Sequence, residues 1–399
     1  MQQTTQIKAR PHPGQLAVHD NPARFKVLAA GRRWGKTRLG VNECLDVAAH
    51  KGRAWWVAPN YKMSEVGWRP LRKMAQRAAW EVRKVDRQII LPNGGEVTVR
   101  SADDPNSLRG EGLDFCVMDE CAFMQEQAWI EAIRPALSDR QGKAVFISTP
   151  SGRNWFWKLW QRGQEDGREW QSWRLPTSDN PYIPESEIES AKESLPELTF
   201  EQEYLAVFLE NSGSVFRNIG ACLAAPLDPK PDDHKEHKKV GGLDWGKHKD
   251  FTALSIGCVD CGVEIARDRF NQIDYTFQRD RIRVHHDRWN VNTWLAESNS
   301  MGEPNIEQMQ RDGMPVMGFA TTGTTKAPLI ENLALALERA EWQFQNDPVW
   351  TGELEAYERK VSPVTGRSQY SAPEGMNDDT VIGRALMLWQ AVNGAIQIF

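Results

Sequence analysis

A glycine-containing loop between an apolar strand and a helix constrains the fold of this chain more than any other feature. Residues 25–30 (FKVLAA) form an apolar run, residues 31–37 (GRRWGKT) follow, and helical periodicity begins at Lys36. This order matches the phosphate-binding loop of nucleotide hydrolases, although Ala30 stands where that pattern has its first glycine. We therefore expect a parallel α/β domain that holds phosphate at a helix N-terminus.

Each side chain of the loop has a chemical role in this hypothesis. Lys36 reaches the β- and γ-phosphates of ATP, and the Thr37 hydroxyl binds Mg²⁺. Arg32 and Arg33 add positive charge beside the phosphates, and the backbone at Gly31 and Gly35 cradles them. The alternative is an ordinary basic turn between a strand and a helix.

Acidic and hydroxyl side chains follow two later apolar strands. Asp119 and Glu120 end the strand expected at Leu113–Met118, and Ser148 and Thr149 end the strand expected at Ala144–Ile147. Asp119 is expected to hold Mg²⁺, and Glu120 to activate the attacking water as a general base. Ser148 and Thr149 fit a coupling motif beside the nucleotide, or a simple hydroxyl-rich turn before proline.

The remaining pattern predicts a parallel sheet covered by helices in the first half and a mixed α/β second half. A hairpin is expected around Asn93-Gly94. The expected domains are residues 1–210 and 240–399, and the proline-rich and charged segment 211–239 is read as a linker.

Charge is distributed unevenly along the chain. Residues 1–100 carry 19 Lys and Arg against 7 Asp and Glu, a balance of +12, whereas the rest has a balance of −17. The basic part suggests a phosphate-bearing partner. The acidic remainder argues against non-specific coating of nucleic acid and is compatible with carboxylates gathered around metal ions. No apolar run is long enough for a membrane span, and residues 1–14 lack a secretory signal pattern.

The ordered motifs GRRWGKT (31–37), SLRGEGLDFCVMDE (107–120) and FISTPSG (146–152) resemble the ATPase half of the large terminase subunits, the DNA-packaging motors of tailed double-stranded DNA bacteriophages. The resemblance runs from about Pro13 to Gln390. It implies a P-loop ATPase domain of the ASCE/RecA-like type followed by an RNase H-like nuclease domain. Gln15 is similar to an adenine-reading glutamine, or is only an exposed glutamine. Arg109 fits an arginine finger acting within the subunit or on a neighbour, or a surface arginine.

The same resemblance implies an acidic nuclease site. Asp244 ends the first expected strand of the second half, Glu297 ends the fourth in the motif ESNSMG, and Asp378 and Asp379 open the last helix. These carboxylates are expected to bind two Mg²⁺ or Mn²⁺ ions about 4 Å apart, with Asp379 slightly favoured over Asp378. Lys326 is expected either to contact DNA phosphate or to cap its helix.

The expected function is ATP-driven movement of double-stranded DNA into a viral procapsid and cutting of concatemeric DNA in the host cytoplasm. The implied partners are duplex DNA, the portal protein, the small terminase subunit and further copies of the chain in a ring. Two alternatives remain: an ATP-dependent helicase or remodeller, which needs a second RecA-like domain, and a non-catalytic scaffold. Cys258 and Cys261 have zinc spacing, with His234 and His237 upstream, but a tight hairpin is the favoured interpretation of the cysteine pair.

Overall fold

The computed structural model describes residues 11–210, 212–246, 250–299, 302–361 and 368–394. Two compact units make up the chain: the first consists mainly of Met1–Glu193 and Glu197–Asn211, and the second mainly of Ser212–Lys360 and Ser368–Phe399. Each unit has a sheet and hydrophobic cores of its own. Across the described residues, no helix has the length and apolar character to cross a membrane.

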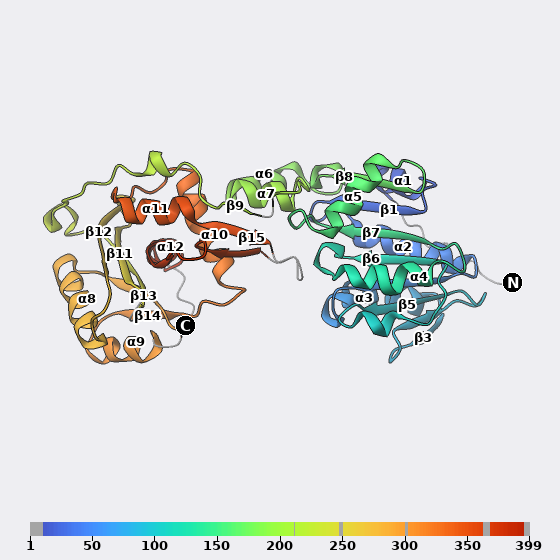
Figure 1. Cartoon of the computed structure of the whole chain (residues 1–399), viewed down its shortest axis with the longest axis horizontal. Coiled ribbons are helices and arrows are strands. Elements are labelled where there is room, and N and C mark those ends of the chain that lie inside the picture. Colours follow the sequence, from blue (N-terminus) through green and yellow to red (C-terminus); the bar gives the residue numbers. More distant parts are fainter. Residues whose placement is uncertain (1–10, 211, 247–249, 300–301, 362–367, 395–399) are drawn as a thin grey trace. The chain divides into compact units, whose positions relative to one another are not determined.

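An eight-stranded sheet forms the centre of the first unit, in the order β3-β4-β5-β2-β6-β7-β1-β8 (Figure 1). The six strands from β5 to β8 in this order are parallel, and β3 and β4 add an antiparallel edge. The strands are β1 (Phe25–Ala30), β2 (Arg53–Ala58), β3 (Glu81–Arg83), β4 (Gln88–Ile90), β5 (Glu96–Ser101), β6 (Phe115–Asp119), β7 (Lys143–Ser148) and β8 (Trp170–Leu175). The helices are α1 (Pro13–His19), α2 (Lys36–Ala49), α3 (Tyr61–Arg77), α4 (Arg134–Ala136), α5 (Trp155–Glu165), α6 (Glu185–Ser194) and α7 (Glu197–Glu203).

Both faces of the sheet are buried at its centre because β1, β2, β6 and β7 are apolar at nearly every position. Side chains alternate between the faces, so Trp55 enters the core under α5 whereas Trp56 enters the core under α2 and α3. Parallel strands covered on both faces require such continuous apolar runs. The expected parallel α/β domain and the hairpin at Asn93-Gly94 are therefore confirmed.

The strand order brings three separate loops to one edge of the sheet. Strand β7 lies between β1 and β6 and is parallel to both. The loops that follow these three strands therefore leave the sheet side by side. They carry the phosphate-binding loop, the Asp119-Glu120 pair and Ser148-Thr149, which are far apart in the sequence.

The second unit has a five-stranded mixed sheet in the order β12-β11-β10-β13-β14. Strands β10, β11 and β12 are antiparallel neighbours, whereas β13 and β14 are parallel to β10. Helices α8 and α9 lie on one side of the sheet, and α10, α11 and α12 on the other (Figure 1). The strands are β10 (Lys239–Asp244), β11 (Thr252–Cys258), β12 (Val263–Phe270), β13 (Thr293–Glu297) and β14 (Val316–Phe319). The helices are α8 (Tyr275–Trp289), α9 (Gly302–Arg311), α10 (Lys326–Glu338), α11 (Pro348–Ala356) and α12 (Asp379–Asn393).

This mixed topology is that of the expected RNase H-like domain. The antiparallel β10-β11-β12 meander also separates it from a second RecA-like domain, whose core strands would be parallel. The helicase alternative required such a second domain, so the topology removes its structural basis.

Helix α12 packs directly on β10 because Gly242 has no side chain. A Cβ atom at Gly242 would lie 2.1 Å from the Gly383 carbonyl oxygen and 2.2 Å from the Met387 nitrogen. Nearly all of α12 is buried, from Asp379 to Leu388. The close approach fixes the start of α12, and with it Asp378 and Asp379, beside the end of β10.

The segment 211–239 was expected as a linker, but its described residues, 212–239, carry secondary structure that packs on the second unit. Strand β9 (Ser212–Ser214) pairs with β15 (Glu358–Val361), which neighbours β16 (Ser368–Ser371). Val215, Phe216 and Cys222 are buried in the core formed by α10 and α12. Proline and charge mark irregular backbone here, but the interspersed apolar residues attach that backbone to the domain.

Several other expectations differ from the structure or lie outside the described residues. The apolar and polar residues of Gln125–Leu137 alternate in a way that predicts a helix there, but the structure has a π-helical stretch, Ala128–Ile133, followed by the short α4. Strand β8, which forms one edge of the first sheet, was not expected. The first ten residues, and Ser300 and Met301 of the ESNSMG motif, lie outside the described part of the chain.

Candidate active sites

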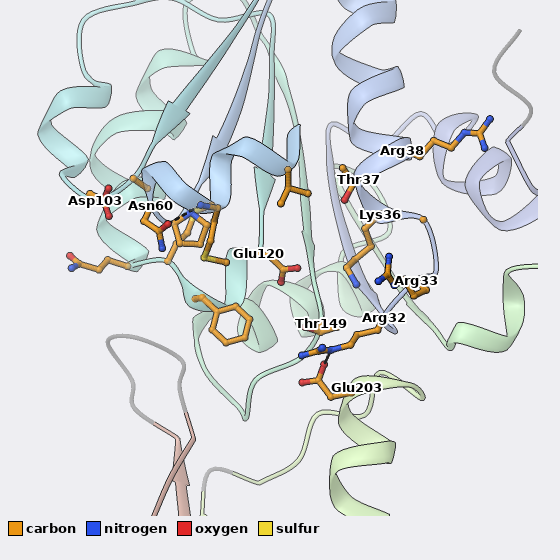
Figure 2. Close-up of a pocket in the computed structure, with 18 residues that line it drawn as sticks. Arg32, Arg33, Lys36, Thr37, Arg38, Asn60, Asp103, Glu120, Thr149 and Glu203 are labelled. Carbon is orange, nitrogen blue, oxygen red and sulfur yellow. Dashed lines mark hydrogen bonds and ion pairs between the residues drawn. The ribbon is translucent and has the colours of Figure 1, made fainter. Parts of the chain in front are cut away.

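A cavity of about 1110 Å³ opens at the edge of the first sheet where β1, β6 and β7 end. Figure 2 shows Lys36 and Thr37 approaching it from the start of α2, and Glu120 from the end of β6. Its lining also includes Arg32, Arg33, Gly35, Arg38, Asn60, Asp103, Thr149 and Glu203. The cavity is therefore surrounded by cationic, hydroxyl and acidic groups, which suits a nucleoside triphosphate and its metal ion.

Lys36 is buried beside this cavity and is held by the loop that precedes it. Its Nζ donates to the carbonyl oxygens of Ala30 (2.7 Å) and Gly31 (3.1 Å). Burial lowers the pKa of Lys36, and the charges of Glu120 and Asp119 oppose that shift. Gly35, with φ of 109°, provides the left-handed turn that aims the first N–H groups of α2 at the cavity.

The acid pair at the end of β6 faces Lys36. Burial raises the pKa of Asp119 well above its ordinary value, the Glu120 charge adds to this, and Lys36 opposes it. Glu120 has a left-handed backbone (φ 50°, ψ 45°), and its Oε2 accepts a hydrogen bond from Ser148 Oγ at 3.2 Å. The strained conformation turns the Glu120 carboxylate into the cavity, and the strand carrying Ser148 holds it there.

Residues beyond β8 support the phosphate-binding loop, and sequence reasoning missed them. Thr177 Oγ1 donates to the Arg32 carbonyl (2.8 Å), and Asn180 Nδ2 donates to the Arg33 carbonyl (2.6 Å). Glu203 Oε2 accepts from Arg32 Nε at 2.6 Å, and this contact is drawn in Figure 2. Only the tertiary structure brings this distant segment to the loop, because no motif marks it.

Gln15 lies beneath the loop and is almost fully buried. Its Nε2 donates to the Gly35 carbonyl (2.9 Å), and its Oε1 accepts from the His12 backbone N–H (3.1 Å). The side chain thus connects α1 to the turn before α2. Recognition of adenine by Gln15 stays a prediction.

Arg109 lies away from this cavity. It follows a 3₁₀ turn (Pro105–Leu108), and its Nη2 donates to Glu131 Oε2 at 2.7 Å on an exposed surface. It lines a different depression, together with Glu111, Glu131 and Asp139. Arg109 is therefore not among the described residues that surround the phosphate-binding loop of its own subunit.

A second acidic site forms where β10 and β13 end side by side. Leu243 is in register with Ala296, so Asp244 and Glu297 come next on adjacent parallel strands. Burial raises the pKa of Asp244 well above its ordinary value, and Glu297, Asp379 and Asp378 each add to that shift. All four expected carboxylates therefore meet at one edge of the sheet.

The two acids at the start of α12 have different partners. Asp379 Oδ2 accepts from the Phe251 N–H (3.3 Å) and lies 3.9 Å from Arg269 Nη2. Burial, opposed by the Phe251 N–H, raises the pKa of Asp379 to about 7. Asp378 Oδ2 instead accepts from Lys326 Nζ at 3.2 Å. Lys326 thus contacts a site acid, which neither of its two expected roles included.

Three more residues surround the acids, and no sequence pattern marked them. Glu353 is buried and accepts from the Thr380 N–H at 3.1 Å, so it caps α12, and it also pairs with Arg269. The phenol of Tyr357 is buried close to Asp378; burial and then the Asp378 charge raise its pKa. Hard oxygen ligands in such a cluster suit Mg²⁺ or Mn²⁺.

Comparison with known proteins gives one consistent family. Residues 27–219 match the family described as terminase large subunit, T4likevirus-type, N-terminal. The large terminase subunit of Thermus virus P23-45 is 28% identical over an alignment covering 94% of this chain and 87% of the relative. That of Escherichia phage T5 is 27% identical, covering 71% and 68%.

A solved structure supports the fold of both units. A large terminase from a thermophilic bacteriophage superposes with a TM-score of 0.63, covering 96% of this chain and 100% of that one at 14% identity. The sequence relatives and the match to the first unit agree with the common two-domain fold. The chain is therefore similar, along nearly its whole length, to large terminase subunits of phages, and residues 27–219 match the N-terminal part of that family.

Proposed function

We propose that this chain hydrolyses ATP to drive double-stranded DNA into a viral procapsid, and that its second unit cuts concatemeric DNA at the start and end of packaging. The observation that carries the proposal is the grouping of Lys36, Thr37 and Glu120 around one cavity, with the buried Asp119 next to Glu120 and close enough to Lys36 for their charges to interact. Motors and nucleases act on DNA through phosphates rather than base edges when they must tolerate every sequence.

In the ATPase reaction, Lys36 exchanges its two carbonyl acceptors for β- and γ-phosphate oxygens. Glu120 accepts a proton from the water that attacks the γ-phosphorus, and the bond to the ADP oxygen breaks. The Thr37 hydroxyl and the Asp119 carboxylate are the hard oxygen donors that fit Mg²⁺, which neutralises phosphate charge when bound. Ser148 keeps the Glu120 carboxylate pointed at the water. Thr149, which lines the cavity directly after β7, couples nucleotide binding to that strand.

In the nuclease reaction, Asp244, Glu297 and Asp379 supply the oxygens for two divalent ions, with Asp378 as a further ligand. When bound there, such ions would supply activation of a water and stabilisation of the leaving oxygen of the phosphodiester. Asp379 is the preferred helix ligand because Asp378 is already paired with Lys326. On this assignment, Lys326 neutralises Asp378 until DNA phosphate competes for it.

The biological setting follows from the family. The expected partners are duplex DNA, the portal protein of the procapsid and the small terminase subunit, in the cytoplasm of an infected bacterium. A ring of subunits is expected because Arg109 lies away from the cavity of its own subunit and is exposed, where it can reach the nucleotide of a neighbour.

Two variants with opposite effects test the proposal. Lys36→Ala is expected to abolish ATP hydrolysis while Mn²⁺-dependent nicking of supercoiled plasmid continues. Asp244→Ala is expected to abolish nicking while ATP hydrolysis continues. Lys158→Ala and Asp280→Asn, which change exposed residues in the same units, serve as controls.

Full ATPase activity in Lys36→Ala, or undiminished nicking in Asp244→Ala, contradicts the assignment of the corresponding site. Packaging itself is measured as DNA protected from nuclease inside procapsids. Both variants are expected to fail there, the second because concatemers are not cut.

A further inference from the structure

Four nitrogen and sulfur side chains that can bind a metal ion meet at the end of the second sheet that lies away from the carboxylates. They are His234 and His237, from the segment before β10, and Cys258 and Cys261, from the β11–β12 turn. One ligand atom of each residue lies within 4.8 Å of all the others. Neither reaction described above uses these residues.

The spacing of these atoms fits a tetrahedral ion. Cys261 Sγ lies 3.2 Å from His237 Nδ1 and 3.5 Å from His234 Nδ1, and Cys258 Sγ lies 3.4 Å from His237 Nδ1. With Zn–S of about 2.3 Å and Zn–N of about 2.05 Å, the tetrahedral angle separates S and N by about 3.6 Å. The sulfur–nitrogen distances are thus close to those of a coordinated ion.

We propose that His234, His237, Cys258 and Cys261 bind one structural Zn²⁺ ion. Both histidines coordinate through Nδ1, and both cysteines coordinate as thiolates, so binding releases one proton from each thiol. Two imidazoles and two thiolates form a closed four-ligand set with no open position for a substrate. The ion therefore holds the fold rather than acting in catalysis.

Backbone hydrogen bonds hold the loops that carry the four ligands close together. The buried Lys239 donates from Nζ to the carbonyl oxygens of His234 (2.7 Å), His237 (2.8 Å) and Lys235 (3.2 Å). The lysine thereby folds the His234–His237 loop around one point. On the cysteine side, the Gly262 N–H donates to the Cys258 carbonyl (3.0 Å) and closes the turn that carries Cys261.

The position of the site separates it from the nuclease centre. Lys239 is in register with Cys258 at one end of the β10–β11 pair, and Asp244 is in register with Ala253 at the other. Five residue steps along β10, at about 3.4 Å each, separate the two ends by about 17 Å. A zinc ion here would connect the end of the 212–239 segment to the β11–β12 turn and stabilise the start of the central strand β10.

The first test is the metal content of the full chain, purified without chelator from zinc-supplemented medium. About one zinc per chain is expected in the wild type and in Asp244→Ala, which removes a nuclease ligand. Cys261→Ser and His237→Asn are expected to lower the bound zinc at least tenfold. Cys222→Ser, a thiol change elsewhere in the same unit, is the matched control and is expected to keep the zinc.

The second test is replacement by Co²⁺, whose visible absorption distinguishes tetrahedral thiolate coordination from octahedral oxygen coordination. The tetrahedral bands are expected in the wild type and Asp244→Ala, and are expected to be lost in Cys261→Ser. Three results would each overturn the proposal. The wild type contains no zinc, or both ligand variants retain zinc. The third is an intact mass lower by two hydrogens, which shows that Cys258 and Cys261 form a disulfide. If Cys261→Ser fails to fold, the zinc contents of the wild type and of His237→Asn decide the test.

Discussion

Replacing Asp379 by asparagine is expected to stabilise the metal-free protein at neutral pH while removing nuclease activity. Burial raises the pKa of Asp379 from 3.8 to about 7. The folded chain therefore keeps a proton that the unfolded chain loses between these pH values, so the free energy of unfolding falls as pH rises through this window. Above pH 7, where the carboxylate is ionised in the folded and the unfolded chain, the loss of unfolding free energy reaches its maximum.

The size of this stabilisation follows from the difference between the folded and unfolded pKa values of Asp379. A difference of about 3 pH units, at about 1.36 kcal/mol each, gives about 4 kcal/mol. Asparagine can still accept from the Phe251 N–H, and Arg269 keeps its ion pair with Glu353 at 3.1 Å. Only the 3.9 Å contact between Arg269 and Asp379 is lost. We therefore expect a net gain of about 2–4 kcal/mol at pH 8.

The assay is scanning calorimetry of the full chain without added divalent ions. At pH 8 the transition of the second unit is expected to rise by roughly 5–15 °C in Asp379→Asn, since about 1 kcal/mol shifts a domain of this size by 2–4 °C. At pH 4.5 the gain in unfolding free energy is expected to shrink to about 1 kcal/mol. Asp280→Asn, at an exposed position, is the control. A variant less stable than the wild type at pH 8, or a gain independent of pH, would refute the reasoning.

Three further substitutions test other parts of the structure. Arg384→Met leaves the fully buried Glu264 without its ion-pair partner at 2.7 Å, so the free energy of unfolding is expected to fall by about 3–5 kcal/mol in thermal unfolding. The double variant with Glu264→Gln is expected to recover part of this loss. An unchanged melting curve contradicts the prediction. Gly242→Ala pushes α12 away from β10 and is expected to lower the stability of the second unit by about 1–3 kcal/mol and to reduce plasmid nicking, while ATPase activity is retained. Glu203→Gln releases Arg32 from its 2.6 Å ion pair, so titration with a fluorescent ATP analogue is expected to show binding several-fold tighter; weaker binding would mean that Glu203 orients Arg32 for the phosphates.

Local patterns predicted many of the elements and placed the proposed reacting groups of both sites at strand and helix ends. The apolar run before residues 31–37 was a buried strand because parallel strands covered on both faces need continuous apolar residues. Lys36, Thr37 and Glu120 line one cavity, with the buried Asp119 next to Glu120, because acids and loops at the carboxyl ends of parallel strands share one edge of the sheet. Asp244 and Glu297 lie on adjacent strands for the same reason.

Other features depend on contacts between distant segments, which leave no local pattern. Thr177, Asn180 and Glu203 support the phosphate-binding loop only because α7 and the turn after β8 fold back over it. The segment 211–239 resembled a linker because its prolines and charges disfavour long helices and strands, whereas a few apolar side chains in its described part, 212–239, attach it to the second unit.

The amino-acid sequence by itself determined which groups are candidates for the chemistry, because strand and helix periodicity and motif spacing are local properties of the chain. Only the tertiary structure decided how those groups are held and charged, since burial, register and close packing arise from residues far apart in sequence. The His234–His237 and Cys258–Cys261 pairs illustrate the difference: each pair alone is a weak signal, and the register of β10 with β11 brings the two together.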